Sequence, residues 1–340
     1  MPQPERKIDL LLVRMDRMGD LVLNLPVDQV HEVKEYYCHW LITSGLGFVC
    51  DLAQPQRSYT EHSLKFSLRG VLRLVRWLKQ YSPQQAIVFH APWWVGLALF
   101  LARVPKRGGR LSQWHSFLFY NQGLRQKRSL AQRHETEYNL ELLLSCIQSS
   151  DPKKPESPTG GLEGQAPALN LFHPDGRAIL REKGLSEKDY VVVHPGMGGS
   201  ALNWPQKHYS RAIDKILAHR PVVITGTYQD RQYLKDLEER FSQHPKVHWL
   251  VGRLTSKELV AVLQGARAVL APSTGVLHLA ASTGSFSLGL YSNVLVESAR
   301  RWGPRGPRAQ VLEAPDGWSG PLAMEKITVQ EVMAQLEGIL

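Results

Sequence analysis

The sequence predicts an α/β protein with two doubly wound, Rossmann-like parallel sheets that face a cleft. Short runs rich in β-branched and other apolar residues alternate with longer helical patterns along most of the 340-residue chain. Such alternation is typical of βαβ units, in which neighbouring strands are parallel. A stretch dense in Pro, Gly, Ser and Lys, residues 149–168, interrupts the alternation, which then resumes. A chain of this length is expected to form about two domains.

The interruption sets the expected domain boundaries. We expect a Rossmann-like domain over residues 1–150, a linker over 151–168 and a second Rossmann-like domain over 169–325. Residues 326–340 are expected to form a C-terminal helix, because a Thr-Val-Gln-Glu capping box at 328–331 opens an amphipathic pattern.

The first half of the chain predicts three strands and three helices. A Gly-containing turn separates the first strand from the first helix. In the second helix, Val71, Leu72, Val75 and Leu78 are expected on one face, with arginines opposite. In chain order the expected elements are strand 7–14, helix 19–34, strand 39–43, helix 69–81, strand 87–90 and helix 93–103.

The second half repeats this alternation with six apolar runs of strand length. Between them, Tyr209, Ile213, Ile216 and Leu217 form the apolar stripe of one helix, and a capping box at 255–258 opens another. The expected strands are 190–194, 222–225, 247–251, 268–271, 287–291 and 310–313.

Composition and cysteine usage exclude several classes of protein. Hydrophobic residues make up 43% of the chain and charged residues 21%, which is typical of a globular protein and not of a disordered one. No apolar run approaches the roughly 20 residues of a membrane-spanning helix, and the N-terminus lacks the apolar core of a signal peptide. The three cysteines, Cys38, Cys50 and Cys146, form no CxxC pair. We therefore expect a reducing, cytoplasmic location and no zinc site.

The net charge of +10 is concentrated in the first half. Residues 1–150 carry 19 Lys and Arg against 12 Asp and Glu, and between Arg57 and Arg133 there are 14 basic residues and one acidic residue, Glu61. Such a stretch attracts phosphates of nucleic acid, of an anionic membrane or of a phosphorylated substrate, or serves only as a solvated surface. Nucleic acid is the least favoured, because no helix-turn-helix, RRM or zinc module is present.

The first candidate site follows the first strand, in the segment VRMDRMGDLVLNL. Ligands of open parallel sheets bind beyond the carboxyl ends of the strands, so Arg14, Asp16, Arg17 and Asp20 are expected in the functional zone of this sheet. Gly19 permits close backbone approach. The alternative for Asp20 is a charge that only complements a helix dipole.

Two later segments have the features of phosphate-binding loops. In VVVHPGMGGSALNWP a strand leads into a glycine-rich loop whose N–H groups could converge on an anion. In AVLAPSTGVLHLAA a strand leads into a helix start with hydroxyl groups. The alternatives are an ordinary glycine-rich loop and a histidine buried in the core. The candidate residues are Gly196, Gly198, Gly199 and Ser200 in the first segment, and Ser273, Thr274, Gly275 and His278 in the second.

Several motifs are missing. No DxD motif is present to hold a diphosphate through a metal, and no HExxH or GxSxG motif occurs. Two phosphate loops in one α/β domain suit a nucleotide diphosphate, and the missing DxD motif weakens the case for a diphosphate held through a metal. We expect no cofactor.

The ordered set of these segments resembles glycosyltransferase family 9, the lipopolysaccharide heptosyltransferases. The resemblance runs from about residue 7 to residue 314. Its carriers are DRMGDLVLNLP (16–26), HETEYNLELL (134–143), HPGMGGSALNWP (194–205), ITGTYQDR (224–231) and APSTGVLHLAA (271–281).

The resemblance implies a GT-B fold and an inverting, metal-independent sugar transfer. The N-terminal domain would bind the acceptor, a phosphorylated glycolipid such as the lipopolysaccharide core, near Arg14, Arg17 and Gly19, at the inner face of the cytoplasmic membrane. The C-terminal domain would bind the nucleotide-sugar donor, typically ADP-heptose. Asp20 would be the catalytic base. The segment from Ser273 to His278 would hold the donor phosphates, and Asp230 would contact the donor nucleoside.

Two departures from the family pattern leave alternatives open. Leu202 stands where members often carry a basic residue that contacts the diphosphate, and Ser273 stands where characterised heptosyltransferases have Asp. A donor other than ADP-heptose, or a non-catalytic nucleotide-sugar-binding relative, therefore remains an alternative.

The basic stretch also contains Trp77, Trp93, Trp94 and Trp114. We expect Trp77 to pack in the core, whereas Trp93 and Trp94 could lie either in the core or at an anionic membrane surface.

Overall fold

The computed structural model describes residues 7–148, 167–196 and 202–340. Its chain divides into two compact units. Unit 1 comprises Met1–Arg128 and Arg133–Leu169, and unit 2 comprises Ser129–Gln132 and Asn170–Leu340. The predicted linker lies outside the described residues except for its last two positions.

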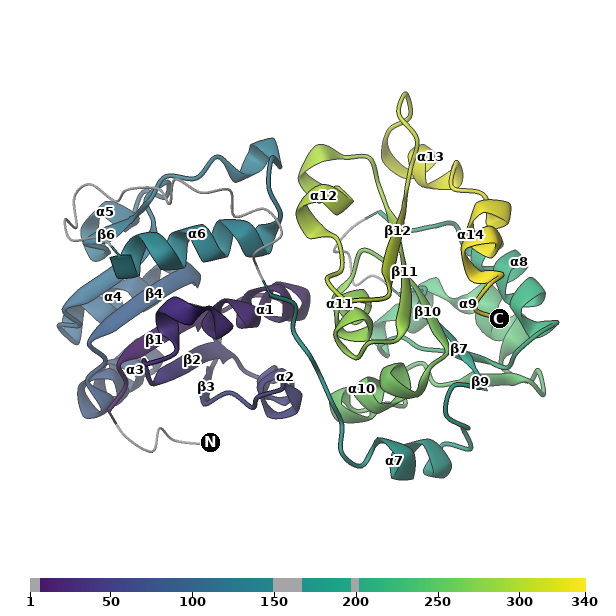
Figure 1. Ribbon diagram of the computed structural model, residues 1–340, viewed down its shortest axis with the longest axis horizontal. Coiled ribbons are helices and arrows are strands. Elements are labelled where there is room, and N and C mark those ends of the chain that lie inside the picture. Colours follow the sequence, from purple (N-terminus) through teal and green to yellow (C-terminus); the bar gives the residue numbers. More distant parts are fainter. Residues whose placement is uncertain (1–6, 149–166, 197–201) are drawn as a thin grey trace. The chain divides into compact units, whose positions relative to one another are not determined.

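Each unit contains a six-stranded sheet in which all strand pairs are parallel (Figure 1). The order is β3-β2-β1-β4-β5-β6 in unit 1 and β12-β11-β10-β7-β8-β9 in unit 2. The strands are β1 (Leu10–Arg14), β2 (Cys38–Thr43), β3 (Tyr59–His62), β4 (Gln85–His90), β5 (Lys106–Arg110), β6 (Gln122–Leu124), β7 (Val191–Val193), β8 (Val222–Ile224), β9 (Val247–Trp249), β10 (Ala268–Pro272), β11 (Phe286–Tyr291) and β12 (Ala309–Glu313).

In both sheets the order in which strands are added reverses beside the first strand. In unit 1 the chain adds β2 and β3 on one side of β1 and then continues with β4 on the other side. In unit 2 the chain adds β8 and β9 on one side of β7 and then continues with β10 on the other. In open α/β sheets, ligands bind beyond the carboxyl ends of the strands at such a reversal. The ends of β1 and β4, and of β7 and β10, are therefore the expected ligand-binding positions of the two units.

Helices connect the strands in both units (Figure 1). In unit 1 they are α1 (Met18–Asn24), α2 (Gly47–Leu52), α3 (Leu68–Tyr81), α4 (Trp93–Leu101), α5 (Ser116–Phe119) and α6 (Glu135–Gln148). In unit 2 they are α7 (Gly176–Glu182), α8 (Gln206–Leu217), α9 (Lys235–Phe241), α10 (Ser256–Gly265), α11 (Gly275–Ser282), α12 (Ala299–Trp302), α13 (Gly320–Glu325) and α14 (Val329–Leu336).

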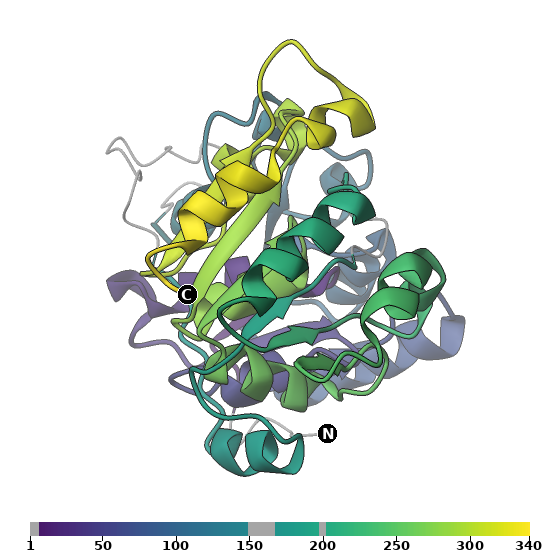
Figure 2. The same cartoon turned by 90° about the vertical axis from the view of Figure 1, so that its right-hand side faces the viewer.

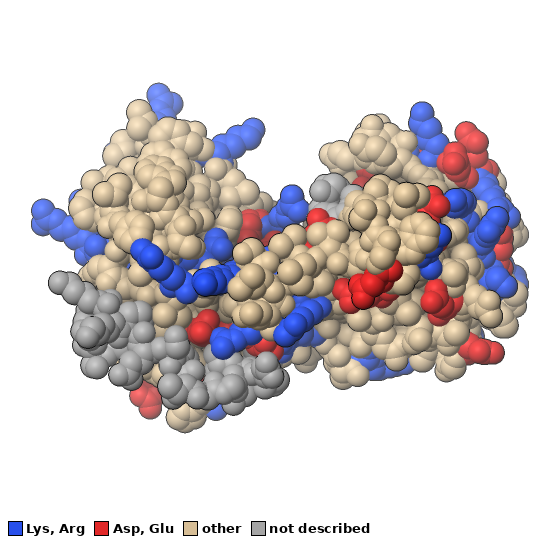
Figure 3. All heavy atoms as spheres, turned by 90° about the horizontal axis from the view of Figure 1, so that it is seen from above, with Lys and Arg blue, Asp and Glu red and all other residues tan. Residues whose placement is uncertain are grey.

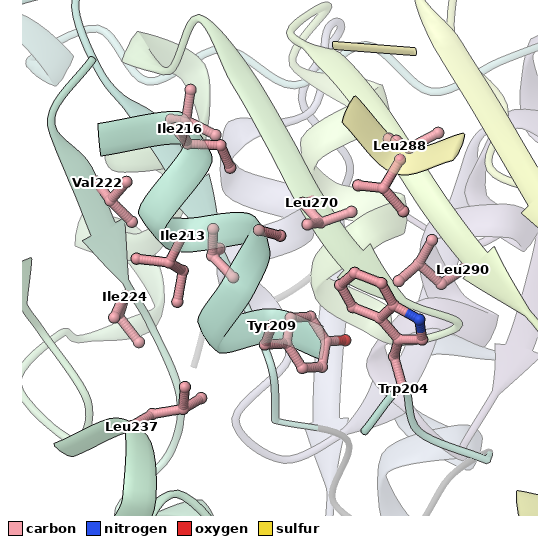
Figure 4. Packing of buried hydrophobic residues seen from close by; sticks show 14 of the residues in the cluster. Trp204, Tyr209, Ile213, Ile216, Val222, Ile224, Leu237, Leu270, Leu288 and Leu290 are labelled. Carbon is pink, nitrogen blue, oxygen red and sulfur yellow. The ribbon is translucent and has the colours of Figure 1, made fainter. Parts of the chain in front are cut away.

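The core of unit 2 lies between its sheet and α8, as Figure 4 shows. The predicted stripe of α8 is buried from Tyr209 to Leu217 and packs on the apolar side chains of β7, β8, β10 and β11. Trp204 is fully buried and donates its indole N–H to the carbonyl of Ile327 at 2.8 Å. The last helix, α14, packs beside α8 (Figure 2), and its predicted capping box between Thr328 and Glu331 is present.

The predicted first half lacks β3, β5 and β6, and two of its further details are wrong. The helix expected at 19–34 ends at Asn24, and a 3₁₀ turn at Leu25–Gln29 follows, because Pro26 has no N–H to continue an α-helix. On α3 the buried stripe contains Leu74 in place of Leu72, whose side chain is 54% exposed.

Candidate functional site

The first candidate site lies at the carboxyl ends of β1 and β4 in unit 1. Arg14 is the last residue of β1 and pairs with His90, the last residue of β4, after a register shift between Val13 and Arg14. Helix α1 begins at Met18, which puts Asp20 in its first turn. Both residues therefore lie at the reversal point of the sheet, as predicted.

Arg14 binds two carboxylates with one nitrogen. Its Nη2 donates to Asp20 Oδ1 at 2.6 Å and lies 2.8 Å from Asp16 Oδ2, while its Nε donates to Asp16 Oδ1 at 3.0 Å. The guanidinium is buried, with only 3% of the side chain exposed. Burial alone would lower the pKa of Arg14, but the charges of Asp16, Asp20 and Glu135 outweigh it and raise that pKa. Arg14 is therefore a permanent cation beneath the two aspartates.

The two aspartates keep part of their surface open. The exposed fraction of the side chain is 18% for Asp20 and 15% for Asp16. Burial raises the pKa of Asp16 to about 7, and the neighbouring charges of Asp20 and Glu135 add to that effect against the opposing charge of Arg14. Asp16 is thus a carboxyl that titrates near neutral pH beside the predicted base.

A second charged pair, formed by Glu135 and Arg128, lies next to Arg14. Glu135, the first residue of α6, is 2% exposed; its Oε1 accepts a short hydrogen bond from Arg128 Nη1 and lies 3.6 Å from Arg14 Nη1. The same Arg128 nitrogen donates to Asn139 Oδ1 at 3.0 Å. Sequence reasoning missed Glu135 and Arg128, although the segment HETEYNLELL contains the glutamate.

The other predicted acceptor residues lie beside this network. Arg17 is exposed at the position that precedes α1, and Gly19 is half-buried in the first turn of that helix. Both are close in sequence to Asp20, on the surface of unit 1.

A cavity of about 360 Å³ lies beyond the carboxyl ends of β2 and β3 in the same unit. Two cations, Lys65 and Arg73, line it together with the start of the 14-residue helix α3, where Ser67 accepts the N–H of Gly70 at 3.0 Å. The Thr43 hydroxyl donates to the carbonyl of Asp16 and so connects this edge to the Arg14 site. No sequence motif predicted the cavity; the basic bias of residues 57–133 was its only signal. Its remaining lining residues include Ser44, Thr60, Glu61, His62, Ser63, Leu74 and Trp77.

In unit 2 the end of β7 approaches Asp230 closely. A Cβ atom on Gly196 would come within 2.7 Å of the Asp230 carboxyl carbon, so only glycine fits there. Asp230 is buried, and its Oδ2 accepts the N–H of Thr227 at 2.8 Å and the hydroxyl of the same residue at 2.7 Å. Asp230 therefore fixes the turn after β8. The predicted residues Gly198, Gly199 and Ser200 lie outside the described residues.

His194, at the end of β7, is neutral at physiological pH. Burial lowers the pKa of His194 to about 4, although the charge of Asp230 opposes that shift. Its Nδ1 bonds with the hydroxyl of Thr225 at 2.9 Å. The histidine side chain at the end of β7 is therefore uncharged.

The start of α11, after β10, has the geometry of an anion site. Thr274 is the N-cap residue, is 7% exposed, and its Oγ1 has no hydrogen-bond partner in the part of the chain that the structure describes. The first-turn N–H groups of a helix lack intrahelical acceptors. Gly275 begins the helix and His278, buried, follows one turn later, while Ser273 donates its N–H to Leu290.

Leu202 packs against the hydrophobic core of unit 2. At this position, where family members often carry a basic residue, this chain therefore has an apolar side chain that packs on the core.

The model of glycosyltransferase family 9 (heptosyltransferase) matches residues 71–328, which is more than half of the chain. The chain belongs to glycosyltransferase family 9. The resemblance found in the sequence is thus confirmed, and the protein is a glycosyltransferase.

Similar proteins and solved structures agree with this assignment. A predicted glycosyltransferase of Haemophilus influenzae is 27% identical over 96% of this chain and 95% of its own length. The structure of the ADP-heptose lipopolysaccharide heptosyltransferase II of Escherichia coli is 16% identical, with a TM-score of 0.78 over 98% of both chains. A family 9 structure from Veillonella parvula has a TM-score of 0.76 at 15% identity, over 100% of this chain and 98% of its own. The predicted GT-B fold is confirmed.

The described residues contain no group of three or more His, Cys, Asp and Glu side chains arranged to hold a metal ion. Among the same residues, no helix is both long and apolar enough to cross a bilayer.

Proposed function

We propose that this family 9 enzyme transfers a sugar with inversion, without a metal, from a nucleotide sugar to a phosphorylated glycolipid of the lipopolysaccharide-core type. ADP-heptose is the favoured donor. The observation that carries the proposal is the partly exposed Asp20 carboxylate, held by the buried cation Arg14 at the sheet reversal of unit 1. A base for glycosyl transfer must be fixed in place and accessible to the acceptor hydroxyl.

In the proposed reaction Asp20 takes the proton of the acceptor hydroxyl. The acceptor oxygen then forms its bond to the anomeric carbon as the bond from that carbon to the diphosphate oxygen breaks on the opposite face, which inverts the configuration. Arg14 orients the carboxylate through its Nη2, and Glu135, which is itself bound by Arg128, lies beside Arg14. The leaving diphosphate needs fixed dipoles or cations, because no metal takes its charge.

Unit 2 would supply those dipoles. The start of α11 offers free N–H groups and the buried Thr274 hydroxyl, a combination suited to a phosphate oxygen. We propose that Ser273, Thr274, Gly275 and His278, with the loop of Gly196, Gly198, Gly199 and Ser200, bind the diphosphate. Asp230 would contact the nucleoside through Oδ1, since its Oδ2 is engaged by Thr227. Escherichia coli heptosyltransferase structures with ADP and with ADP-2-deoxy-2-fluoro heptose support an adenine nucleotide as donor.

Unit 1 would bind the acceptor near Arg14, Arg17 and Gly19. The cavity beside β2 and β3 is suited to an acceptor phosphate, because Lys65 and Arg73 and a helix start line it. We also propose a cytoplasmic location, which the three unpaired cysteines support.

The test is Asp20→Asn, measured with a panel of ADP-, UDP- and GDP-sugars. We expect turnover to fall by about 10²–10⁴-fold, while calorimetry shows ADP binding within a few fold of the wild type. Glu35→Gln, an exposed carboxylate of the same unit, is the control and should leave both unchanged. Near-normal turnover of Asp20→Asn would contradict Asp20 as base. Donor binding by the wild type without transfer to any acceptor would favour the non-catalytic alternative.

A further inference from the structure

Helix α4 is apolar on both of its faces. All nine residues of its sequence, WWVGLALFL, are apolar or glycine. Its inner face is buried, whereas Trp93, Phe100 and Leu101 are 40%, 49% and 46% exposed, with Leu97 half-buried between them. Positions 93, 97, 100 and 101 lie on one side of a helix. Outer helices of α/β proteins normally place polar residues on this side, so the outer face of α4 has the composition of a contact surface.

Aromatic side chains from neighbouring segments extend this face. Phe66, which is 52% exposed, stacks on Trp93 with ring centroids 5.6 Å apart. At the other end of α4, Phe119 of α5 lies 6.3 Å from Phe100, and its neighbours Phe117 and Leu118 are 62% and 63% exposed. We call the set Phe66, Trp93, Phe100, Leu101, Phe117 and Leu118 the α4–α5 surface. Trp94, in contrast, is buried, and Trp77 packs partly buried against the core.

Cations border the α4–α5 surface. The Arg107 guanidinium lies 5.6 Å from the centre of the Phe100 ring, and that of Arg125 lies 5.5 Å from the centre of the Phe117 ring. The one carboxylate between residues 57 and 133, Glu61, accepts the N–H of Gly47 at 2.6 Å. Figure 3 shows Lys and Arg projecting at the edges of a broad uncharged area of unit 1.

We propose that the α4–α5 surface docks this enzyme on an anionic lipid bilayer. A bilayer offers an apolar layer to the aromatic side chains and negative headgroups to the arginines beside them. A second copy of the chain fits poorly, because joining two such surfaces would bring their basic borders together. Nucleic acid fits the arginines but leaves Leu101 and Leu118 in water. The proposal adds to the proposed function and does not depend on which sugar is transferred.

The test is sedimentation of the full chain with vesicles of phosphatidylcholine, alone or mixed with phosphatidylglycerol. We expect binding to the mixed vesicles, weakening as salt is raised, and little binding to phosphatidylcholine alone. The double variant Phe117→Ser/Leu118→Ser should bind about tenfold or more weakly, since two large apolar side chains no longer enter the bilayer. The matched control is Leu295→Ser/Val296→Ser, an exposed apolar pair of unit 2, which should bind like the wild type.

Circular dichroism and ADP binding show that each variant is folded, and they make failure here distinguishable from failure of the proposed function. No binding to the mixed vesicles at low salt would overturn the proposal. So would equal losses in both double variants, or a stable dimer that the Phe117→Ser/Leu118→Ser variant abolishes.

Discussion

The carboxyl edge of the sheet carries a network of charged side chains around Arg14 in unit 1. In unit 2 the same edge carries glycine, hydroxyl and neutral imidazole groups, and its buried carboxylate, Asp230, is bound by Thr227. Arg14 gathers Asp16, Asp20 and Glu135 at the end of β1. The end of β7 has a neutral His194 and a close approach of Gly196, and β10 leads to the Thr274 hydroxyl. One topology thus supports two kinds of site.

The difference matches two chemical tasks. A carboxylate that serves as a base, as proposed for Asp20, is charged, so it needs a counter-ion such as Arg14 to stay in place inside a mostly buried site. A phosphate brings its own charge, so unit 2 can bind it with backbone dipoles and hydroxyl groups. Substitutions at the carboxyl edges of the two sheets should therefore change different measured quantities.

The largest expected effect is on stability, from Glu135→Ala in unit 1. This change leaves the buried Arg14 and Arg128 without the carboxylate they share. Removing one partner of a buried ion pair costs about 3–5 kcal/mol, which urea unfolding would measure. The control is Asp214→Ala, which breaks a half-exposed pair with Arg240 in unit 2 and should cost less than about 1 kcal/mol. An equal loss of unfolding free energy in the two variants would contradict a larger contribution of the buried Glu135 pairs than of the exposed Asp214–Arg240 pair.

The two units also differed in how far their folds could be predicted. All six strands of unit 2 were predicted. Strands β7, β8, β10 and β11 are buried throughout, whereas β9 and β12 are only partly buried. In unit 1, β3, β5 and β6 were missed. Strand β5 reads KRGGR, and its glycines are there because a Cβ on Gly108 would come 2.6 Å from Cys146 Sγ and one on Gly109 2.6 Å from the ring of Tyr120. Because the crowded positions hold glycine, β5 lacks the apolar pattern from which a strand is predicted.

The site residues divide in the same way. The positions of Arg14 and Asp20 could be predicted from sequence, because Arg14 ends a strand and Asp20 opens a helix beside a glycine. Glu135 and Arg128 could not be found by local rules, because Glu135 comes to lie between Arg14 and Arg128 only through the fold. The segment that contains Glu135 stood out by resemblance alone, and its role as the shared partner of two arginines needed the structure.

A smaller effect is expected from Thr274→Val in unit 2, in ligand affinity and not in stability. Valine keeps the shape of threonine but removes the buried hydroxyl. A hydrogen bond to a charged group contributes about 1.5–3 kcal/mol, so ADP should bind roughly 10–100-fold more weakly by calorimetry. The free energy of unfolding should stay constant or rise slightly, because that hydroxyl has no partner among the described residues. Thr274→Ser, which keeps the hydroxyl, is the control. Unchanged ADP affinity in Thr274→Val would show that the start of α11 does not bind the diphosphate.

A further expected effect is a change in the pH dependence of stability from Asp16→Asn. Because the pKa of Asp16 is raised to about 7 in the folded protein, the folded state holds a proton that the unfolded chain releases near pH 4. The free energy of unfolding therefore falls as pH rises from about 4 to about 7, by at most about 1.4 kcal/mol per pH unit from this group, and is level above. Asp16→Asn should remove this slope in urea titrations across that range, while Asp214→Asn in unit 2 should not. A wild-type slope in Asp16→Asn would contradict the raised pKa of Asp16.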